Sequence, residues 1–439
     1  MTAMDNILLR KAAVQSVALM IAVVTLSYAL KHYQVITITA GSLFIDGTVS
    51  TEAATEDVII SLENELGDNN APAVQTSMKE EMEPILDAED LRSRIDRNIL
   101  AKLGDNFLAI HKPEGDSISI RLEDKYVTHS IQLNLDGVTG KDMDNRSIYR
   151  IRGNRLFAGD PEYTEITAWE VDEDTGDMVD VVTKSFGEDI SHGITITTAP
   201  AAQSGFYTTQ ILLVLDTVYA YIIYEDKDYY YIDLRKPSEV YDKIIVIDAG
   251  HGGKDAGALS MDDKLYEKDI NLDIVLQLKE LLDTQEDIKV YYTRTTDNTV
   301  YLRPRVTLAN ALDCDYFISI HCNAYPGTAP NGNEVLYYDT EYKGVKAAKL
   351  ASICSDELSK TVALRSRGIV KKRMKDIFIM DEAQVPMVLI EAGFMTNKKD
   401  LAYLTDGESR KNIAKGIYNA ILRAYEELPA AALRTGGSR

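Results

Sequence analysis

The second half of the chain alternates long apolar runs with amphipathic segments, and this alternation limits the possible folds more than any other feature. Residues 243–250 (KIIVIDAG) form a continuous apolar run ending in glycine, as expected of a strand covered on both faces. Residues 271–283 then show helical periodicity. The alternation predicts an α/β fold, a three-layer domain over residues 241–428 with a mostly parallel, twisted sheet. Further strands are expected at 289–297, 316–324, 333–339 and 386–394, and further helices at 302–312, 343–361 and 408–427.

Residues that can bind or activate a metal stand near the ends of three of these strands. His251 follows the first strand, His321 lies at the end of another, and Glu391 lies in the last; Glu267 begins the first helix. Open α/β sheets place their sites at the carboxyl ends of the strands, so we expect these side chains to converge. Two imidazoles and one carboxylate leave a tetrahedral position for water, which is typical of a catalytic zinc. Taken alone, His321 would more often be a hydrogen-bonded core histidine.

The three cysteines are too few for a disulfide-dense scaffold or for a zinc site made only of thiolates. Successive side chains of a strand point to opposite faces, so Cys322 should face the helices if His321 faces the site. We interpret Cys314, Cys322 and Cys354 as small buried residues.

Six motifs occur in order across residues 243–427. They are IVIDAGHGGKDAGA (245–258), YEKDINL (266–272), TRTTD (293–297), LRPRVTLANAL (302–312), YFISIHCNA (316–324) and VPMVLIEAGFMTN (385–397). Together they resemble the type 3 family of zinc-dependent N-acetylmuramoyl-L-alanine amidases. The departures are mild: Ala249 stands where the family often has proline, and Cys322 where it often has alanine.

The resemblance implies a cell-wall hydrolase that cleaves the amide between N-acetylmuramic acid and L-alanine in peptidoglycan. It makes His251, Glu267 and His321 the ligands of one zinc ion per catalytic domain, and Glu391 the catalytic residue. Two rival functions are a zinc peptidase acting within the stem peptide and a non-catalytic wall-binding protein. The intact set of four residues argues against the second.

Several other polar residues are candidates for supporting roles. Asp248 could orient His251 from behind, or make a strand-end hydrogen bond to backbone. Arg294 and Arg305 match family motif positions and could contact substrate or form ion pairs, and Asn323 is a further candidate. A basic cluster could attract the carboxylates of stem peptides or form a solvated surface; it comprises Arg365, Arg367, Lys371, Lys372, Arg373 and Lys375.

Residues 105–236 favour a small all-β domain, because short alternating or β-branched runs are separated by turn residues. Its position and β pattern are similar to the cell-wall-targeting domains that precede some amidases. The acidic run at 170–180 predicts a hairpin tip, with a calcium site as the alternative. Strands are expected at 117–123, 130–135, 147–152, 164–171, 192–198, 210–216 and 219–225.

Residues 49–98 are rich in Glu, Asp, Asn and Ala, so residues 34–104 are expected to form an acidic spacer, with a helix through 84–103. Residues 429–439 predict a disordered tail.

Residues 12–30 are uncharged and largely apolar, and basic residues flank them on both sides. A helix of this length, at about 1.5 Å per residue, would just cross a hydrocarbon core of roughly 30 Å. The preceding Arg10-Lys11 pair should stay cytoplasmic, so residues 1–33 predict a short inner tail and a single-pass membrane anchor with the catalytic domain outside. The alternative is a cleaved signal peptide, with Ser27 and Ala29 as a small-x-small site, and a secreted protein.

The formal net charge is −22, of which residues 1–240 carry −20 and residues 241–439 carry −2. This acidity argues against a nucleic-acid partner. The resemblance implies peptidoglycan as the partner, and a nearly neutral catalytic half can approach this anionic wall. The cytoplasmic membrane is expected to be contacted through the N-terminal helix. Residues 339–369 leave room for one helix and its turns. We therefore expect no inserted autoinhibitory helix of the kind that plugs the zinc site in some relatives.

Overall fold

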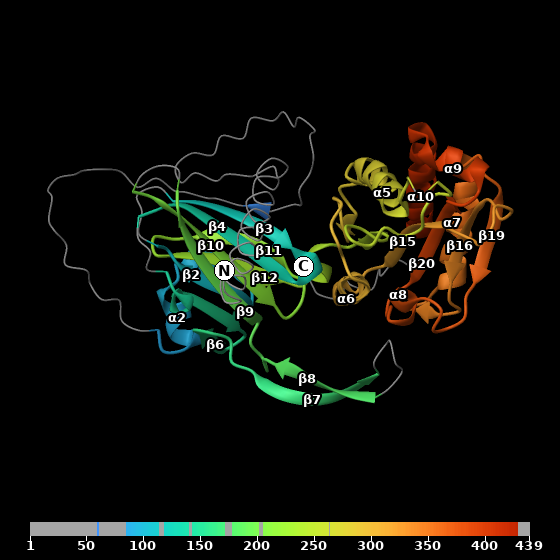
Figure 1. The fold of residues 1–439 in the computed structure, drawn as a ribbon. Helices are drawn as coiled ribbons and strands as arrows, with labels where there is room; N and C mark the ends of the chain where they lie inside the picture. The colour runs from blue at the N-terminus through green and yellow to red at the C-terminus, as the bar shows by residue number, and fades with distance from the viewer. Residues whose placement is uncertain are drawn as a thin grey trace, which may run out of the picture.

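The computed structural model describes residues 59–60, 85–113, 118–139, 143–171, 178–201, 205–262 and 264–428. Over these ranges an antiparallel β region is followed by an α/β domain (Figure 1). The expected membrane segment at 12–30, nearly all of the spacer before residue 85 and the tail at 429–439 lie outside the described ranges. Within those ranges, no helix combines the length and the apolar character needed to cross a membrane.

Two sheets of the β region share one hydrophobic core. The larger has the order β1-β11-β12-β2-β5-β6 and the smaller the order β3-β4-β10-β9. Alternate residues of β2 and β4, such as Leu108 and Leu133, are fully buried in this core. The strands are β1 (Ile59–Ile60), β2 (Asn106–His111), β3 (Ser119–Lys125), β4 (Ser130–Val138), β5 (Ile148–Arg152), β6 (Arg155–Ala158), β9 (Ser191–Pro200), β10 (Tyr207–Leu215), β11 (Ala220–Glu225) and β12 (Tyr229–Arg235), with 3-10 turns at Tyr126–Thr128 and Asn145–Ser147.

A separate two-stranded hairpin projects from this region (Figure 1). Its strands, β7 (Thr164–Val171) and β8 (Met178–Ser185), pair antiparallel from Thr164–Ser185 to Val171–Met178. The acidic run that predicted a hairpin tip therefore falls at the end of a hairpin, with residues 172–177 outside the described ranges.

The single helix expected at 84–103 is instead two short helices, α2 (Ala88–Arg94) and α3 (Arg97–Leu100). Ile95 is extended, and the Asp96 side chain caps α3 by accepting hydrogen bonds from the backbone N–H groups of Asn98 and Ile99. Leu91 and Ile95 pack against the outer face of the larger sheet. Residues 85–104, assigned to the spacer from sequence, thus pack with the β region.

The α/β domain is built on a six-stranded sheet with the order β14-β13-β15-β20-β16-β19. All neighbours run parallel except β16 and β20, which are antiparallel, so the mostly parallel sheet is confirmed. The strands are β13 (Ile244–Ala249), β14 (Lys289–Tyr292), β15 (Tyr316–Asn323), β16 (Asn333–Tyr337), β19 (Ser366–Lys371) and β20 (Met387–Phe394), preceded by the short helix α4 (Pro237–Val240).

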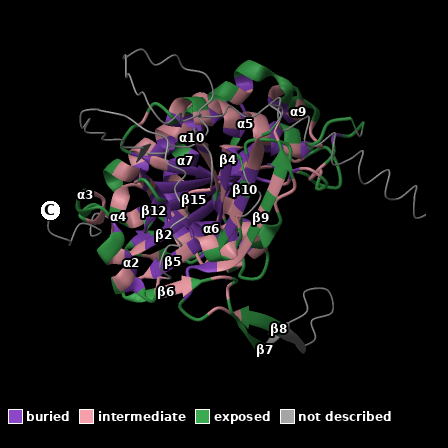
Figure 2. Cartoon of the chain, turned by 90° about the vertical axis from the view of Figure 1, so that its left-hand side faces the viewer, coloured by how far each residue is buried: buried purple, intermediate pink, exposed green. Residues whose placement is uncertain are grey.

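Helices cover both faces of this sheet, which makes the predicted three layers. Ile245 and Ile247 of β13 pack with α5, α7 and α10, whereas Ile244 and Val246 pack with α6 and α8 on the opposite face. Figure 2 shows buried residues gathered along the strands, as a strand covered on both faces requires. The helices are α5 (Glu267–Leu282), α6 (Leu302–Leu312), α7 (Ala347–Thr361), α8 (Phe378–Asp381), α9 (Lys398–Thr405) and α10 (Gly407–Glu427).

Residues 339–369 form a small hairpin, one helix and the start of a strand. The hairpin pairs β17 (Glu341–Tyr342) with β18 (Val345–Lys346), and α7 follows directly. Helix α7 buries Leu350, Cys354 and Leu358 in the core that it shares with α10.

The β region and the α/β domain meet at Tyr126, which lies in the turn between β3 and β4. Its hydroxyl donates a hydrogen bond to the carbonyl of Tyr292 at 2.9 Å and accepts one from the N–H of Tyr292 at 3.2 Å. Its ring packs edge-on against Tyr291, with centroids 5.0 Å apart. Because β14 is an edge strand, Tyr126 satisfies backbone groups that no neighbouring strand reaches.

Replacing Tyr126 by Phe should therefore lower the free energy of unfolding by about 1–2 kcal/mol, since it removes two buried hydrogen bonds. Thermal or urea unfolding measures this loss. The control is Tyr301→Phe, at a side chain 72% exposed, which should leave stability unchanged. Equal stability of the two variants would contradict the interdomain role of Tyr126.

The three cysteines are buried thiols, as predicted, and none of them forms a disulfide; Cys322 packs among the helices of one face. Burial raises the pKa of the Cys354 thiol to about 12 and that of Cys322 well above its usual value. A thiol reagent at pH 8 should therefore label no cysteine in the folded protein and all three after denaturation. Rapid labelling of the folded protein would show that these thiols are accessible.

Candidate metal centre

Four sequence-predicted residues meet at the carboxyl edge of the sheet. His251 follows β13, Glu267 is the first residue of α5, and His321 and Glu391 pair across β15 and β20. Strands β13 and β15 are parallel neighbours, with Ala249 opposite Ile320, so His251 and His321 leave the same edge. The predicted convergence is confirmed.

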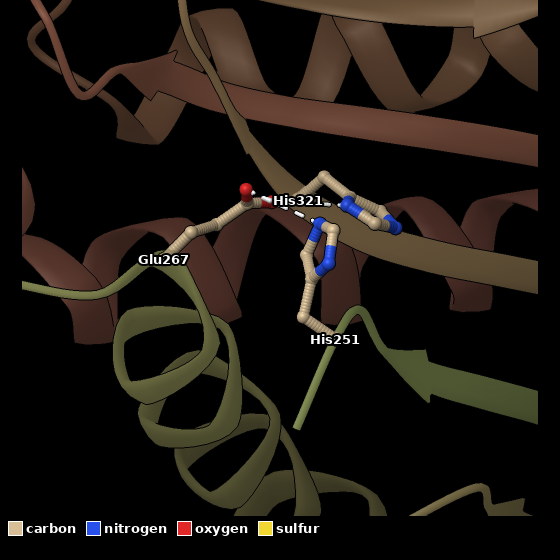
Figure 3. Close-up of side chains that lie close together, drawn as sticks. All are labelled: His251, Glu267 and His321. Atoms are coloured by element: carbon tan, nitrogen blue, oxygen red, sulfur yellow. Dashed lines mark hydrogen bonds and ion pairs between the residues drawn. The ribbon is translucent and has the colours of Figure 1, made fainter. Parts of the chain in front are cut away.

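His251, Glu267 and His321 can each offer one ligand atom, and these atoms lie within 4.8 Å of one another. Figure 3 shows the Glu267 carboxylate directed towards both imidazoles. Its oxygens lie 3.2 Å from Nε2 of His251 and 2.9 Å from Nδ1 of His321. The two rings are nearly perpendicular, with centroids 4.9 Å apart.

Two glycines make this close approach possible. A Cβ atom on Gly250 would lie 2.3 Å from the His321 ring. A Cβ atom on Gly257 would lie 2.6 Å from Oε2 of Glu267 and 2.7 Å from the His251 ring. Larger side chains at either position would push the three candidate ligands apart.

The Glu267 carboxylate is almost completely buried, with 3% of the residue exposed. Backbone N–H groups of Ala258 and Cys322 donate to it at 2.8 and 3.0 Å, and Asn271 donates through Nδ2 at 3.1 Å. Although burial opposes ionisation, the hydrogen bonds and charges of the two histidines lower the pKa of Glu267. The carboxylate is therefore ionised and oriented.

Asp255 contacts a candidate ligand, although the sequence had not singled it out. Its Oδ2 lies 2.8 Å from Nδ1 of His251. A carboxylate on the second nitrogen of a metal-binding imidazole fixes the ring and its tautomer. Burial lowers the pKa of His251, but Glu267 and Asp255 outweigh it and raise that pKa to about 9. The sequence signal that could have identified Asp255 is its position, four residues after a candidate ligand histidine.

Asp248 was a candidate either for orienting His251 or for a strand-end hydrogen bond to backbone, but it joins a buried side-chain network instead. It is fully buried, forms an ion pair with Arg305, and accepts hydrogen bonds from the hydroxyls of Thr293 and Ser319. Although burial opposes it, the Arg305 charge lowers the pKa of Asp248.

Arg294 and Arg305 hold the backbone that carries His251. Arg294 donates to the carbonyls of Ala249 and Gly250, both at 2.9 Å. Arg305 donates to the carbonyls of Ala249 at 2.7 Å and His251 at 2.6 Å. Both arginines are buried, so the structure places them under the loop, away from a position where substrate would touch them.

Glu391 stands beside the cluster. Burial raises its pKa to about 7; the neighbouring charge of His321 opposes the rise. The charges of Glu267 and Glu334 add to the rise, and Lys372 opposes it. Its Oε2 atom is buried and has no hydrogen-bond partner among the described residues. Asn323, the remaining candidate, donates through Nδ2 to Glu334 at 3.1 Å.

The donor set fits a divalent metal. Two imidazoles and a carboxylate are the ligands of catalytic zinc sites that keep one position open. Beside this donor set, the buried Oε2 atom of Glu391 lacks a hydrogen-bond partner among the described residues, which is uncommon for a buried polar atom.

Comparisons with known proteins cover the domain that carries this site. The family model described as N-acetylmuramoyl-L-alanine amidase (Amidase_3) matches residues 245–423. The uncharacterised protein YqiI of Bacillus subtilis (strain 168) is 34% identical over 185 residues, which are 42% of this chain and 86% of that protein. The N-acetylmuramoyl-L-alanine amidase CwlM of Bacillus licheniformis is 36% identical over 184 residues, which are 41% of this chain and 68% of that protein.

Among solved structures, the N-acetylmuramoyl-L-alanine amidase of Clostridium difficile 630 is 33% identical, with 42% of this chain and 97% of that chain covered and a TM-score of 0.40. YqiI and CwlM are each matched over more than two thirds of their own length at over 30% identity. On that evidence this chain belongs to the Amidase_3 family of N-acetylmuramoyl-L-alanine amidases, and residues 245–423 are its amidase domain.

Proposed function

We propose that this cell-wall amidase hydrolyses the bond between the lactyl group of N-acetylmuramic acid and L-alanine in peptidoglycan, with one zinc ion at the cluster of His251, Glu267 and His321. The observation that carries the proposal is the cluster itself, placed next to a buried, unpartnered oxygen of Glu391 in an amidase domain.

When bound, zinc supplies an activated water at neutral pH and polarises the carbonyl of the scissile amide. The protein's own part begins with Asp255, which accepts the Nδ1 proton of His251 and so leaves Nε2 free to ligate. Glu267 stays ionised through its backbone and Asn271 donors. Arg294 and Arg305 fix the loop that carries His251.

Glu391 is the proton carrier in this proposal. A carboxyl group with a pKa of about 7 exchanges protons readily near neutral pH, which is what a general acid–base group needs. It takes a proton from the attacking water at Oε2 and passes it to the departing nitrogen of alanine.

The location of the enzyme rests on the sequence. In this proposal residues 12–30 anchor the chain in the cytoplasmic membrane and hold the amidase domain outside, or are removed as a signal peptide. The acidic β region spaces the enzyme from the membrane and presents it to the wall. Any wall affinity of that region then comes from shape and hydrogen bonding, because its negative charge disfavours an anionic polymer.

Digestion of purified peptidoglycan, followed by mass spectrometry, tests the reaction. The products should be peptides with a free L-alanine amino group and glycan strands with intact lactyl groups. A chelator should abolish release, and added zinc should restore it. Cleavage between two stem-peptide residues would show a peptidase instead, and absence of both products would refute the enzymatic assignment.

Glu391→Gln should bind zinc as the wild type does and lose about 10²–10⁴-fold in turnover, because proton transfer is removed while the ligands remain. Elemental analysis and the digestion rate measure the two effects. Glu408→Gln is the matched control, since that side chain is 72% exposed and lies on α10. Wild-type turnover by Glu391→Gln would rule out the proposed role.

A further inference from the structure

A row of polar side chains crosses the sheet from the candidate metal ligands to its far edge. His321 of β15 pairs with Glu391 of β20, and Glu391 pairs with Glu334 of β16. The next strand outwards is β19, the edge strand, which the sequence had suggested only as a basic cluster. The row therefore runs from the metal cluster through the proton carrier to a basic edge.

A β-bulge sets the position of the basic residue at that edge. Asn333 pairs with Ser366 and Val335 with Ile369, so Glu334 faces two residues of β19, Arg367 and Gly368. Gly368 has a φ of +78°, the left-handed conformation typical of a bulge glycine. Bulges beside active sites commonly re-aim a side chain.

The Arg367 guanidinium is held on two sides. Its Nε donates to Oε2 of Glu334, while the other oxygen of Glu334 accepts from Asn323. The guanidinium also lies over the ring of Phe394, 5.2 Å from the centroid. The Arg367 side chain is 34% exposed, and its two terminal nitrogens have no hydrogen-bond partner in the part of the chain that the structure describes.

An oriented guanidinium with free terminal nitrogens is suited to a carboxylate, which it can bind through two parallel hydrogen bonds. Neighbouring strands lie about 4.8 Å apart, so β19 lies about 10 Å from β20. An extended peptide advances about 3.5 Å per residue, so a stem peptide cleaved beside Glu391 can place its second residue within reach of the Arg367 side chain.

Resting on the proposed amidase function, we propose that Arg367 binds the α-carboxylate of the second stem-peptide residue. The enzyme then prefers substrates in which this group is a free acid over substrates in which it is an amide. Lys372, which directly follows β19, is a second positive charge close enough to Glu391 to act on it. Lys371 differs, because it pairs with Asp339 and both of these side chains are largely exposed.

The test compares two soluble muramoyl tripeptides that differ only at this group, one with D-glutamate and one with D-isoglutamine at the second position. Initial rates give kcat and KM for the zinc-loaded wild type, Arg367→Gln and Lys371→Gln. The wild type should prefer the acid about tenfold in kcat/KM, through KM. Arg367→Gln should lose that preference and keep its rate on the amide. Lys371→Gln removes one charge from the same strand and should retain the preference.

Arg367→Gln removes the cation that pairs with the Glu334 carboxylate, which is only 8% exposed, so this variant could fail to fold. In that case the double variant Glu334→Gln/Arg367→Gln, which removes both charges, replaces it in the same rate measurements. Equal losses on both substrates, or no acid preference in the wild type, would overturn the role of Arg367 while leaving the amidase function intact. Failure of the wild type to cleave either substrate would instead refute the proposed function.

Discussion

Burial of the Glu267 carboxylate is the interaction on which the rest of the amidase domain depends. An ionised carboxylate out of water is costly unless it is fully hydrogen-bonded, and here its donors come from separate segments of the chain. Ala258 belongs to the loop after β13, Asn271 to α5, and Cys322 to β15. These segments must be in place together for the carboxylate to be tolerated. The packing that supplies hydrogen bonds to Glu267 also brings His251 and His321 next to its carboxylate. The arrangement that stabilises the fold is therefore the arrangement that the candidate metal site needs.

The loop that carries His251 depends on a second set of buried charges. Arg294 and Arg305 donate to the carbonyls at its start, and Asp248 balances the charge of Arg305 from within the sheet. A buried ion pair is retained only when its remaining donors and acceptors are satisfied, which the loop carbonyls accomplish. Precision at the metal site therefore comes from residues that never need to touch substrate. Strand β19 lies on the other side of Glu391, and in our proposal its exposed edge contacts the substrate.

The secondary-structure elements and site residues that follow from a single physical cause could be predicted from the sequence. Strand β13 and helix α6 were predicted because apolar runs and helical periodicity mark buried elements. The convergence of the candidate ligands was predictable because parallel strands end at one edge. Strand β12 was missed because its sequence, YYYIDLR, shows neither alternation nor the aliphatic run that marked β13, although both strands are buried. Strand β19 was missed because an edge strand can carry exposed charged residues, which here formed part of a basic cluster. The partner of Asp248 depends on contacts between distant segments, which spacing alone does not reveal.

The central claim is that His251, Glu267 and His321 hold a zinc ion while Glu391 remains outside its ligands. Anomalous diffraction from crystals of the zinc-loaded protein, recorded at the zinc edge, tests this most directly. We expect one zinc per chain, bonded to two histidine nitrogens and one Glu267 oxygen at about 2.0–2.2 Å, with Glu391 beyond bonding distance. A zinc ion bonded by Glu391, by the sulfur of Cys322 or by residues elsewhere in the chain would contradict it.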